Sequence, residues 1–153
     1  MTVPPTRPSG VAFLLSQLGA HTAARFAARL AELDLTPSQV GVLRVVGQTP
    51  GISQRQVATS LGAVPSRVVK LVDELEAKGL IERRPSTADR RAHELHVTGG
   101  PQQMAQILAV VSANDVELIA ALSHEEVATL LVLLGKVAAG AGLGPSAHPG
   151  YGR

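Results

Sequence analysis

Helix start and stop signals between residues 53 and 79 constrain the fold more than any other feature of the sequence. Residues 53–56 read Ser-Gln-Arg-Gln, and this spacing of a serine and a glutamine predicts a capping box that starts a short helix. Gly62 is placed to end that helix. Residues 64–66 read Val-Pro-Ser and open a longer helix, because proline favours the first helical position, and Gly79 is placed to stop it. Two helices joined by a tight turn that contains glycine form a helix-turn-helix.

A β-hairpin is predicted directly after the second helix. Residues 80–84 read Leu-Ile-Glu-Arg-Arg and residues 93–97 read His-Glu-Leu-His-Val, and both segments are typical of short strands. The polar turn at 85–92 joins them. A helix-turn-helix followed by a hairpin is a winged helix. Residues 35–98 are therefore expected to form one lobe of a mainly α fold with a small β-hairpin wing.

Long helices are predicted on both sides of this lobe. Apolar residues recur three or four apart over 11–34 and again over 101–122, and Ser123 starts a last helix with a glutamate three residues further on. A capping box that begins at Thr36 separates the first long helix from the lobe. The apolar stripes are wider than one small domain needs. Residues 11–34 and 101–139 are therefore expected to be the dimerisation helices of a homodimer.

The composition fits an aliphatic helical core and excludes several classes of protein. Hydrophobic residues make up 45% of the chain but aromatic residues only 2%, so Leu, Val, Ile and Ala are expected to fill the core. The absence of cysteine excludes disulfides, thiolate catalysis and cysteine-ligated zinc, and it fits a cytoplasmic location. No apolar run approaches the ~20 residues that span a bilayer, so no membrane partner is expected. The Pro-rich residues 1–10 are expected to form a flexible arm, and the Gly- and Pro-rich residues 140–153 a flexible tail.

Basic residues gather in the middle of the chain. Eight basic and five acidic residues lie between Arg55 and Arg91, a net charge of +3, whereas the rest of the chain carries −1. Four arginines flank or occupy the predicted hairpin loop: Arg83, Arg84, Arg90 and Arg91. This surplus indicates a surface for a polyanion such as nucleic acid, although a merely solvated hairpin tip has the same composition.

The order of these elements and residues 71–98, LVDELEAKGLIERRPSTADRRAHELHVT, resemble the MarR family of bacterial transcription regulators. The first part of this segment is similar to the family's recognition helix and its exit into the wing, and residues 89–91, Asp-Arg-Arg, are similar to its Asp-x-Arg wing motif. The resemblance covers roughly residues 11–139. It implies a homodimer that binds a pseudo-palindromic operator in double-stranded DNA, with a repressor relieved by a small-molecule effector as the expected role. Two features depart from the family pattern: Val69 stands where Thr or Ser is common, and residues 99–101 read Gly-Gly-Pro where Pro or Glu often precedes a glycine.

The second helix of the motif carries the expected base contacts. The N-terminal part of a helix that lies in the major groove reaches base edges. Arg67 is suited to bidentate contact with guanine and Lys70 to contact with phosphate, and the alternative for both is an ordinary solvated helix residue. The start of the preceding helix is suited to hold a phosphate. The complete set of expected DNA contacts is Gln54, Arg55, Pro65, Ser66, Arg67, Lys70, Arg84, Asp89, Arg90 and Arg91.

The wing tip is expected to enter the minor groove, whose negative potential attracts guanidinium groups. The resemblance assigns this insertion to Arg91, with Asp89 holding it by a salt bridge and Arg90 facing phosphate. The alternative is that Asp89 only caps the turn. Arg83 and Arg84 alternate across a strand, so at most one of them faces DNA well.

The resemblance also implies a site for small, often aromatic or anionic, effectors between the dimerisation helices and the DNA-binding lobe. His21, Arg25, Phe26 and Arg44 would line this site if the first two helices face it, and the alternative is that all four are helix-surface or core residues. Arg25 and Arg29 lie one turn apart and are equally suited to bond to a partner chain.

Enzymatic function is not indicated by any motif. The sequence has no nucleotide-binding loop, no HExxH and no GxSxG, and its five histidines are scattered over several elements without an i, i+4 pair on a helix. Neither a metal nor a cofactor is therefore expected. Two other functions stay open as alternatives: a winged-helix module that binds protein rather than DNA, and a metal-responsive regulator.

Overall fold

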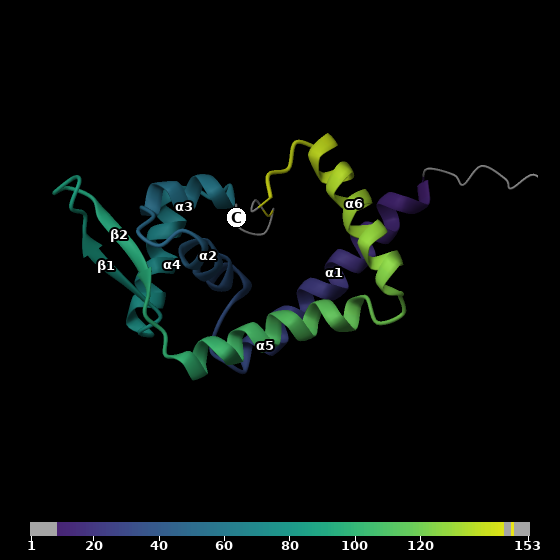
Figure 1. The fold of residues 1–153 in the computed structure, drawn as a ribbon, viewed down its shortest axis with the longest axis horizontal. Helices are drawn as coiled ribbons and strands as arrows, with labels where there is room; N and C mark the ends of the chain where they lie inside the picture. The colour runs from purple at the N-terminus through teal and green to yellow at the C-terminus, as the bar shows by residue number, and fades with distance from the viewer. Residues whose placement is uncertain (1–8, 146–147, 149–153) are drawn as a thin grey trace, which may run out of the picture.

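The structure is a computed structural model that describes residues 9–145 and 148. Its helices and strands follow one another along the chain in the order shown in Figure 1. They are α1 (Ser9–Ala31), α2 (Pro37–Gln48), α3 (Gln54–Leu61), α4 (Pro65–Ala77), β1 (Ile81–Pro85), β2 (His93–Val97), α5 (Pro101–Leu118) and α6 (His124–Gly140). The mainly α fold with a β-hairpin wing is thereby confirmed. Residues 1–8 of the expected arm and residues 146, 147 and 149–153 of the expected tail lie outside the described residues, whereas residues 9 and 10 belong to α1 and residue 140 to α6.

Local capping sets the starts of three helices as the spacing predicts. Three N-cap side chains each accept a hydrogen bond from the backbone N–H three residues further on: those of Thr36, Ser53 and Ser123. The Gln or Glu side chain at that later position in turn accepts from the backbone N–H of the N-cap residue, which completes a capping box. Gly62 ends α3 with a left-handed φ of 64°, a conformation that costs glycine nothing. The turn of the helix-turn-helix is thus fixed by its own sequence.

The hairpin is tied to the lobe as well as to itself. Strands β1 and β2 pair antiparallel, with Ile81 opposite Val97 and Arg84 opposite Glu94. Leu95 then exchanges backbone bonds with the α2–α3 loop, because its N–H donates to Ile52 at 2.9 Å and its carbonyl accepts from Gly51 at 2.9 Å. The base of the wing is therefore held on two sides, and only its tip extends from the lobe.

An aliphatic core fills the lobe. Leu61, Val68, Val72, Leu75 and Leu95 are completely buried, and they come from α3, α4 and β2. Removing these side chains from water supplies most of the lobe's stability. Leu30 of α1 and Ile107 of α5 are buried in this core, and partly buried residues of the same two helices pack against it. The long helices are therefore packed onto the lobe at one end.

The start of α5 explains the Gly-Gly-Pro departure. A Cβ added to Gly99 would lie 2.8 Å from Leu80 Cδ2 and 2.9 Å from Met104 Sδ, so a larger residue there would require these two side chains to shift. Gly100 is the N-cap of α5 and Pro101 its first residue. The chain thus passes closely over the core before it turns into the helix.

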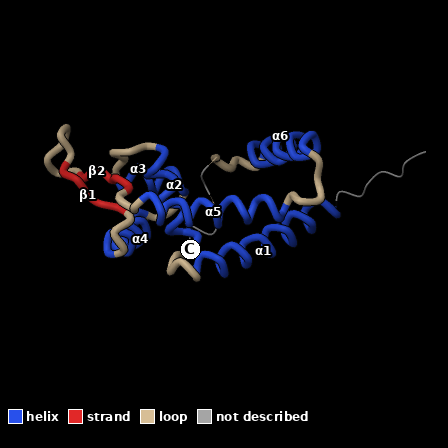
Figure 2. The backbone as a smooth tube through the Cα atoms, turned by 60° about the horizontal axis from the view of Figure 1, so that its bottom comes forward, coloured by secondary structure: helices blue, strands red, loops and turns tan. Residues whose placement is uncertain are grey.

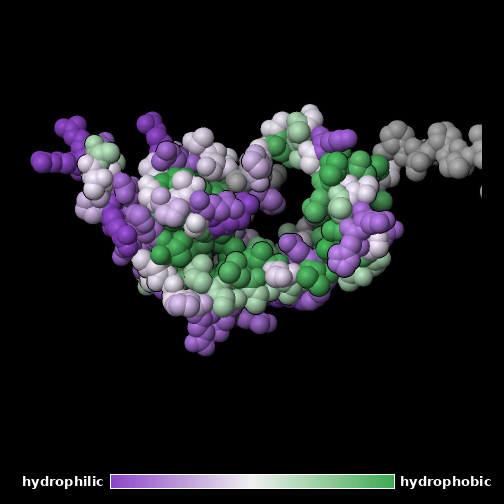
Figure 3. All heavy atoms as spheres, viewed as in Figure 1, coloured by the Kyte–Doolittle hydropathy of each residue, from purple (hydrophilic) through white to green (hydrophobic). Residues whose placement is uncertain are grey.

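The long helices leave the lobe together and keep much apolar surface exposed. α1 and α5 run side by side, whereas α6 stands away from them (Figure 2) and has no buried residue. Apolar surface gathers over α6 and the adjoining part of α1 in Figure 3. The exposed large hydrophobic residues of these helices are Val11, Phe13, Leu14, Leu15, Leu18, Leu108, Val116, Leu118, Leu131, Val132, Leu133, Leu134 and Val137.

α1 ends at Ala31, three residues before the expected end. Asp34 takes a left-handed φ of 54°, and Lys78 at the end of α4 bonds to its carboxylate at 2.7 Å. This turn breaks the helix and brings the chain back toward α4. In the described part of the chain, none of the helices is long and apolar enough to cross a membrane.

Candidate nucleic-acid interface

The outward face of α4 is short and mostly polar. One side of α4 is buried in the core through Val68, Leu71, Val72 and Leu75. The opposite side of the helix therefore faces solvent. Exposed residues lie on that side at helical spacing, and those of its N-terminal half are Ser66, Val69, Lys70 and Asp73. Pro65 is also exposed, at the first helical position. Ser66 and Lys70 are therefore accessible to solvent on the same side of α4.

Arg67 lies apart from this exposed row. Its side chain is half-buried and reaches toward α2, where its Nη2 donates to Ser38 Oγ at 3.4 Å. Its Nε is buried without a hydrogen-bond partner in the structure. In this conformation Arg67 spans the N-terminal ends of α2 and α4, and Lys70 is the cation that points outward.

The wing tip presents two arginines. Asp89 Oδ1 accepts from the backbone N–H of Arg91 at 2.9 Å, and Ser86 Oγ accepts from the N–H of Ala88 at 3.2 Å. These bonds close the turn in the way expected of a capping aspartate. The ion pairs of the described residues include neither Asp89 nor its two neighbours, Arg90 and Arg91, which are exposed to solvent. The salt bridge from Asp89 to Arg91 is therefore absent, and the aspartate shapes the loop instead.

Arg83 has a role that the sequence did not reveal. Its side chain is only 19% exposed, and it pairs with Asp73 and Glu76 of α4, each at 2.5 Å. Its Nη2 also donates to Gln54 Oε1 of α3 at 2.8 Å. One guanidinium group thus joins the wing to both helices of the motif and compensates the carboxylate that α4 presents at Asp73.

The remaining expected contacts surround this junction. The amide oxygen of Gln54 is occupied by Arg83, so its amide N–H groups are what remains for another partner. Arg55 is exposed at the start of α3, where the backbone N–H groups favour an anion. Arg84 is 57% exposed and is paired with Glu82 on the same face of β1. The alternation of Arg83 and Arg84 therefore places one inward and one outward, as the strand period requires.

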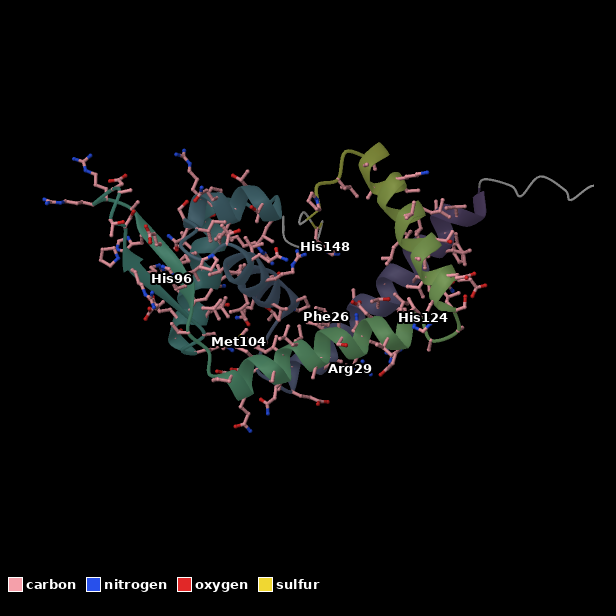
Figure 4. All side chains as sticks on the ribbon, in the orientation of Figure 1. Phe26, Arg29, His96, Met104, His124 and His148 are labelled. Carbon is pink, nitrogen blue, oxygen red and sulfur yellow. The ribbon has the colours of Figure 1, made fainter. Side chains whose placement is uncertain are left out.

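The four expected effector residues fall into two neighbouring cavities. A cavity of about 530 Å³ lies between α1, α2 and α5 and is lined by Phe26 and Arg44, with Met104 on its α5 side (Figure 4). His21 and Arg25 line a smaller cavity of about 200 Å³ between α1 and α5. Asn114 borders both. The four side chains therefore do not share one site within a single chain.

Arg25 and Arg29 have a partner inside the chain. Both pair with Glu117 of α5, Arg29 at 2.5 Å. The carboxylate thus ties α1 to α5, and Arg25 is not left free to bind an anion. As for metals, no group of three or more His, Cys, Asp or Glu side chains suited to one is found among the residues that the structure describes.

Comparisons with known proteins agree with this geometry. The model of the MarR family matches residues 33–92, which contain the helix-turn-helix and most of the wing. A protein of Thauera aromatica, named for transcriptional regulation of the hcr operon, is 42% identical over 101 residues. The match includes 65% of this chain and spans 61% of the relative's length.

Solved structures share nearly the whole fold. A MarR-family transcriptional regulator from Rhodococcus sp. RHA1 has a TM-score of 0.73 and 27% identity, over 88% of this chain and 96% of its own. The transcriptional repressor CouR, solved bound to a 23-mer DNA duplex, has a TM-score of 0.72 and 25% identity, over 90% of this chain and 99% of its own. These relatives are regulators and not enzymes. In its matched motif, its winged helix and its long helices, this chain is similar to transcription regulators of the MarR family.

Proposed function

We propose that the chain is a homodimeric, sequence-specific DNA-binding regulator of transcription in the cytoplasm. The observation that carries this proposal is that one lobe exposes cations on two neighbouring features: Lys70 on the outward row of α4, and Arg90 and Arg91 at the wing tip. A helix fits the major groove and a guanidinium group is attracted into the minor groove. The DNA-bound CouR structure supports the same use of this fold.

The dimer accounts for the exposed apolar surface of the long helices. α6 buries none of its residues within the chain, and Leu131 alone is 67% exposed. Apolar surface of this extent on α1, α5 and α6 favours association with a second copy through a two-fold axis. Two copies then present their α4 helices to half-sites about one helical turn (~10 bp) apart on a pseudo-palindromic operator.

Repression relieved by a small molecule is the regulatory mode that we propose. The cavity of about 530 Å³ is mostly apolar and lies between the lobe and the long helices. An aromatic or other apolar effector bound there would contact α2 of the lobe and both α1 and α5 at once. Its binding would favour dimers with one distance between the two DNA-binding lobes over dimers with another. The affinity of the dimer for its operator would change as a result. Phe26 and Arg44 are the candidate contacts.

A salt titration of DNA binding tests the proposal. The full chain is titrated onto a duplex selected from random DNA, at several salt concentrations, with fluorescence anisotropy as the readout. We expect nanomolar-range binding that weakens steeply with salt, because lysine and arginine contacts release counterions from phosphates. Binding that ignores salt, or no DNA binding with capture of a protein partner, would favour the protein-interaction module. A change of operator affinity on adding zinc would favour the metal-responsive regulator.

A further inference from the structure

We propose that Val69 is a specificity-determining residue that reads the 5-methyl group of a thymine in each operator half-site. The inference rests on the proposed function and deepens it, because it names a base that the middle of α4 selects. Each thymine presents its methyl group in the major groove, where an apolar side chain is the matching contact.

The first support is the exposure of Val69. The side chain is 40% exposed and lies between Ser66 and Asp73 on the outward row of α4. In the described structure, only two of the large hydrophobic residues between α1 and α5 are exposed, Val64 and Val69. All the other large hydrophobics of the lobe turn toward its core or are at least half-covered. The packing of the chain itself therefore gives no reason for a valine at position 69.

The second support is the chemistry of the row. Val69 has no hydrogen-bonding group, so it recognises neither phosphate nor the polar edges of bases. Its neighbour Lys70 supplies a cation for guanine or phosphate, and Ser66 supplies a hydroxyl. A β-branched side chain is held in essentially one rotamer in a helix, so its methyl groups are presented with little loss of entropy. Covering one thymine methyl removes apolar surface from water on both partners.

Val64 is the natural comparison. It is 54% exposed, but it is the N-cap residue of α4 and lies outside the row of Ser66, Val69 and Lys70. Helical spacing therefore points to Val69, not Val64, as the side chain that faces the base pairs.

The test replaces thymine by deoxyuridine, which removes only the methyl group. The operator is first selected from random duplexes with the full chain, and each thymine of one half-site is then exchanged singly. We expect one position at which the exchange weakens binding by about fourfold, the effect of one buried methyl group, and by about fifteenfold when both half-sites are changed. The Val69→Ala variant should bind thymine and deoxyuridine sites equally well. It keeps its fold, because alanine is a better helix former at an exposed position.

Two controls make the result specific. Val64→Ala should keep the full preference for thymine, and Val69→Thr, which retains one methyl group, should keep part of it. If no exchange alters affinity in wild type, or if Val69→Ala keeps the preference, the assignment is overturned while DNA binding itself stands. If Val64→Ala abolishes the preference, Val64 is the reader and the assignment to Val69 is wrong. Absence of salt-sensitive binding to any duplex would overturn the proposed function, and this inference with it.

Discussion

At the scale of single residues, Asp89 is an acidic side chain at a wing tip that we propose to bind DNA. Its charge repels phosphate, yet its carboxylate closes the turn that presents Arg90 and Arg91. Electrostatics alone predicts tighter DNA binding when the charge is removed, whereas the capping role predicts weaker binding when the acceptor is removed. The two effects have opposite signs and can be separated.

We therefore predict that Asp89→Ala weakens operator binding, by about three- to tenfold, because the wing tip loses its turn. Asp89→Asn is the matched control, since it keeps the acceptor oxygen and removes the charge, and it should bind at least as tightly as wild type. Equilibrium titration by anisotropy measures both variants. Tighter binding by Asp89→Ala would show that the carboxylate acts only by repulsion.

The cations at the surface give a second prediction at this scale. Arg91→Ala and Lys70→Ala should each weaken binding to DNA, and the slope of log affinity against log salt should become shallower by about one for each phosphate contact that is lost. Arg67 differs, because its guanidinium reaches Ser38 and not the exposed row. If Arg67 turns to guanine in the complex, Arg67→Ala will lower affinity for the selected operator more than for random DNA. Equal loss on both would exclude a base contact.

At the scale of elements, the wing depends on Arg83. The guanidinium is mostly buried and compensates Asp73 and Glu76 while it holds Gln54. Its removal leaves two carboxylates of α4 facing one another without a cation.

We predict that Arg83→Ala lowers the free energy of unfolding by about 2 kcal/mol, since charged hydrogen bonds in a partly buried site are lost. Arg84→Ala is the matched control on the same strand. Its exposed pair with Glu82 contributes little, so the change should stay within about 0.5 kcal/mol. Urea denaturation followed by circular dichroism measures both. Equal effects in the two variants would contradict the role given to Arg83.

The elements themselves follow from short-range patterns, and this is why the sequence predicts them. The capping boxes at Thr36, Ser53 and Ser123 depend on residues three apart, and all three occur as expected. The partners of Arg83 are 7, 10 and 29 residues away, at Glu76, Asp73 and Gln54, so no local pattern reveals them. The effector residues diverge for a similar reason. Which cavity a side chain of α1 lines depends on how α2 and α5 pack against that helix.

At the scale of the whole molecule, the proposed dimer is needed to bring two DNA-binding lobes onto one operator. Leu131 lies in the middle of α6 and is 67% exposed, so a charge there does not disturb the core of the single chain. It would, however, be buried unpaired in a dimer that covers α6, at a cost of several kcal/mol.

We predict that Leu131→Glu converts the dimer to a folded monomer in light-scattering chromatography and abolishes operator binding at concentrations that saturate wild type. Gln103→Glu, an exposed position at the start of α5, is the matched control and should stay dimeric. A dimeric Leu131→Glu variant would show that another surface joins the two copies.

The spacing of the two half-sites is the sharpest test of the proposed dimer on DNA, because the two α4 helices of a symmetric dimer can only reach adjacent turns on one face of the duplex. The measurement is the affinity of the full chain for its selected operator before and after about 5 bp are inserted between the half-sites, which turns one of them to the opposite face. We expect the insertion to lower affinity by about a hundredfold or more, to the level of a single half-site, because the two lobes can no longer bind together. Unchanged affinity after the insertion would contradict this expectation.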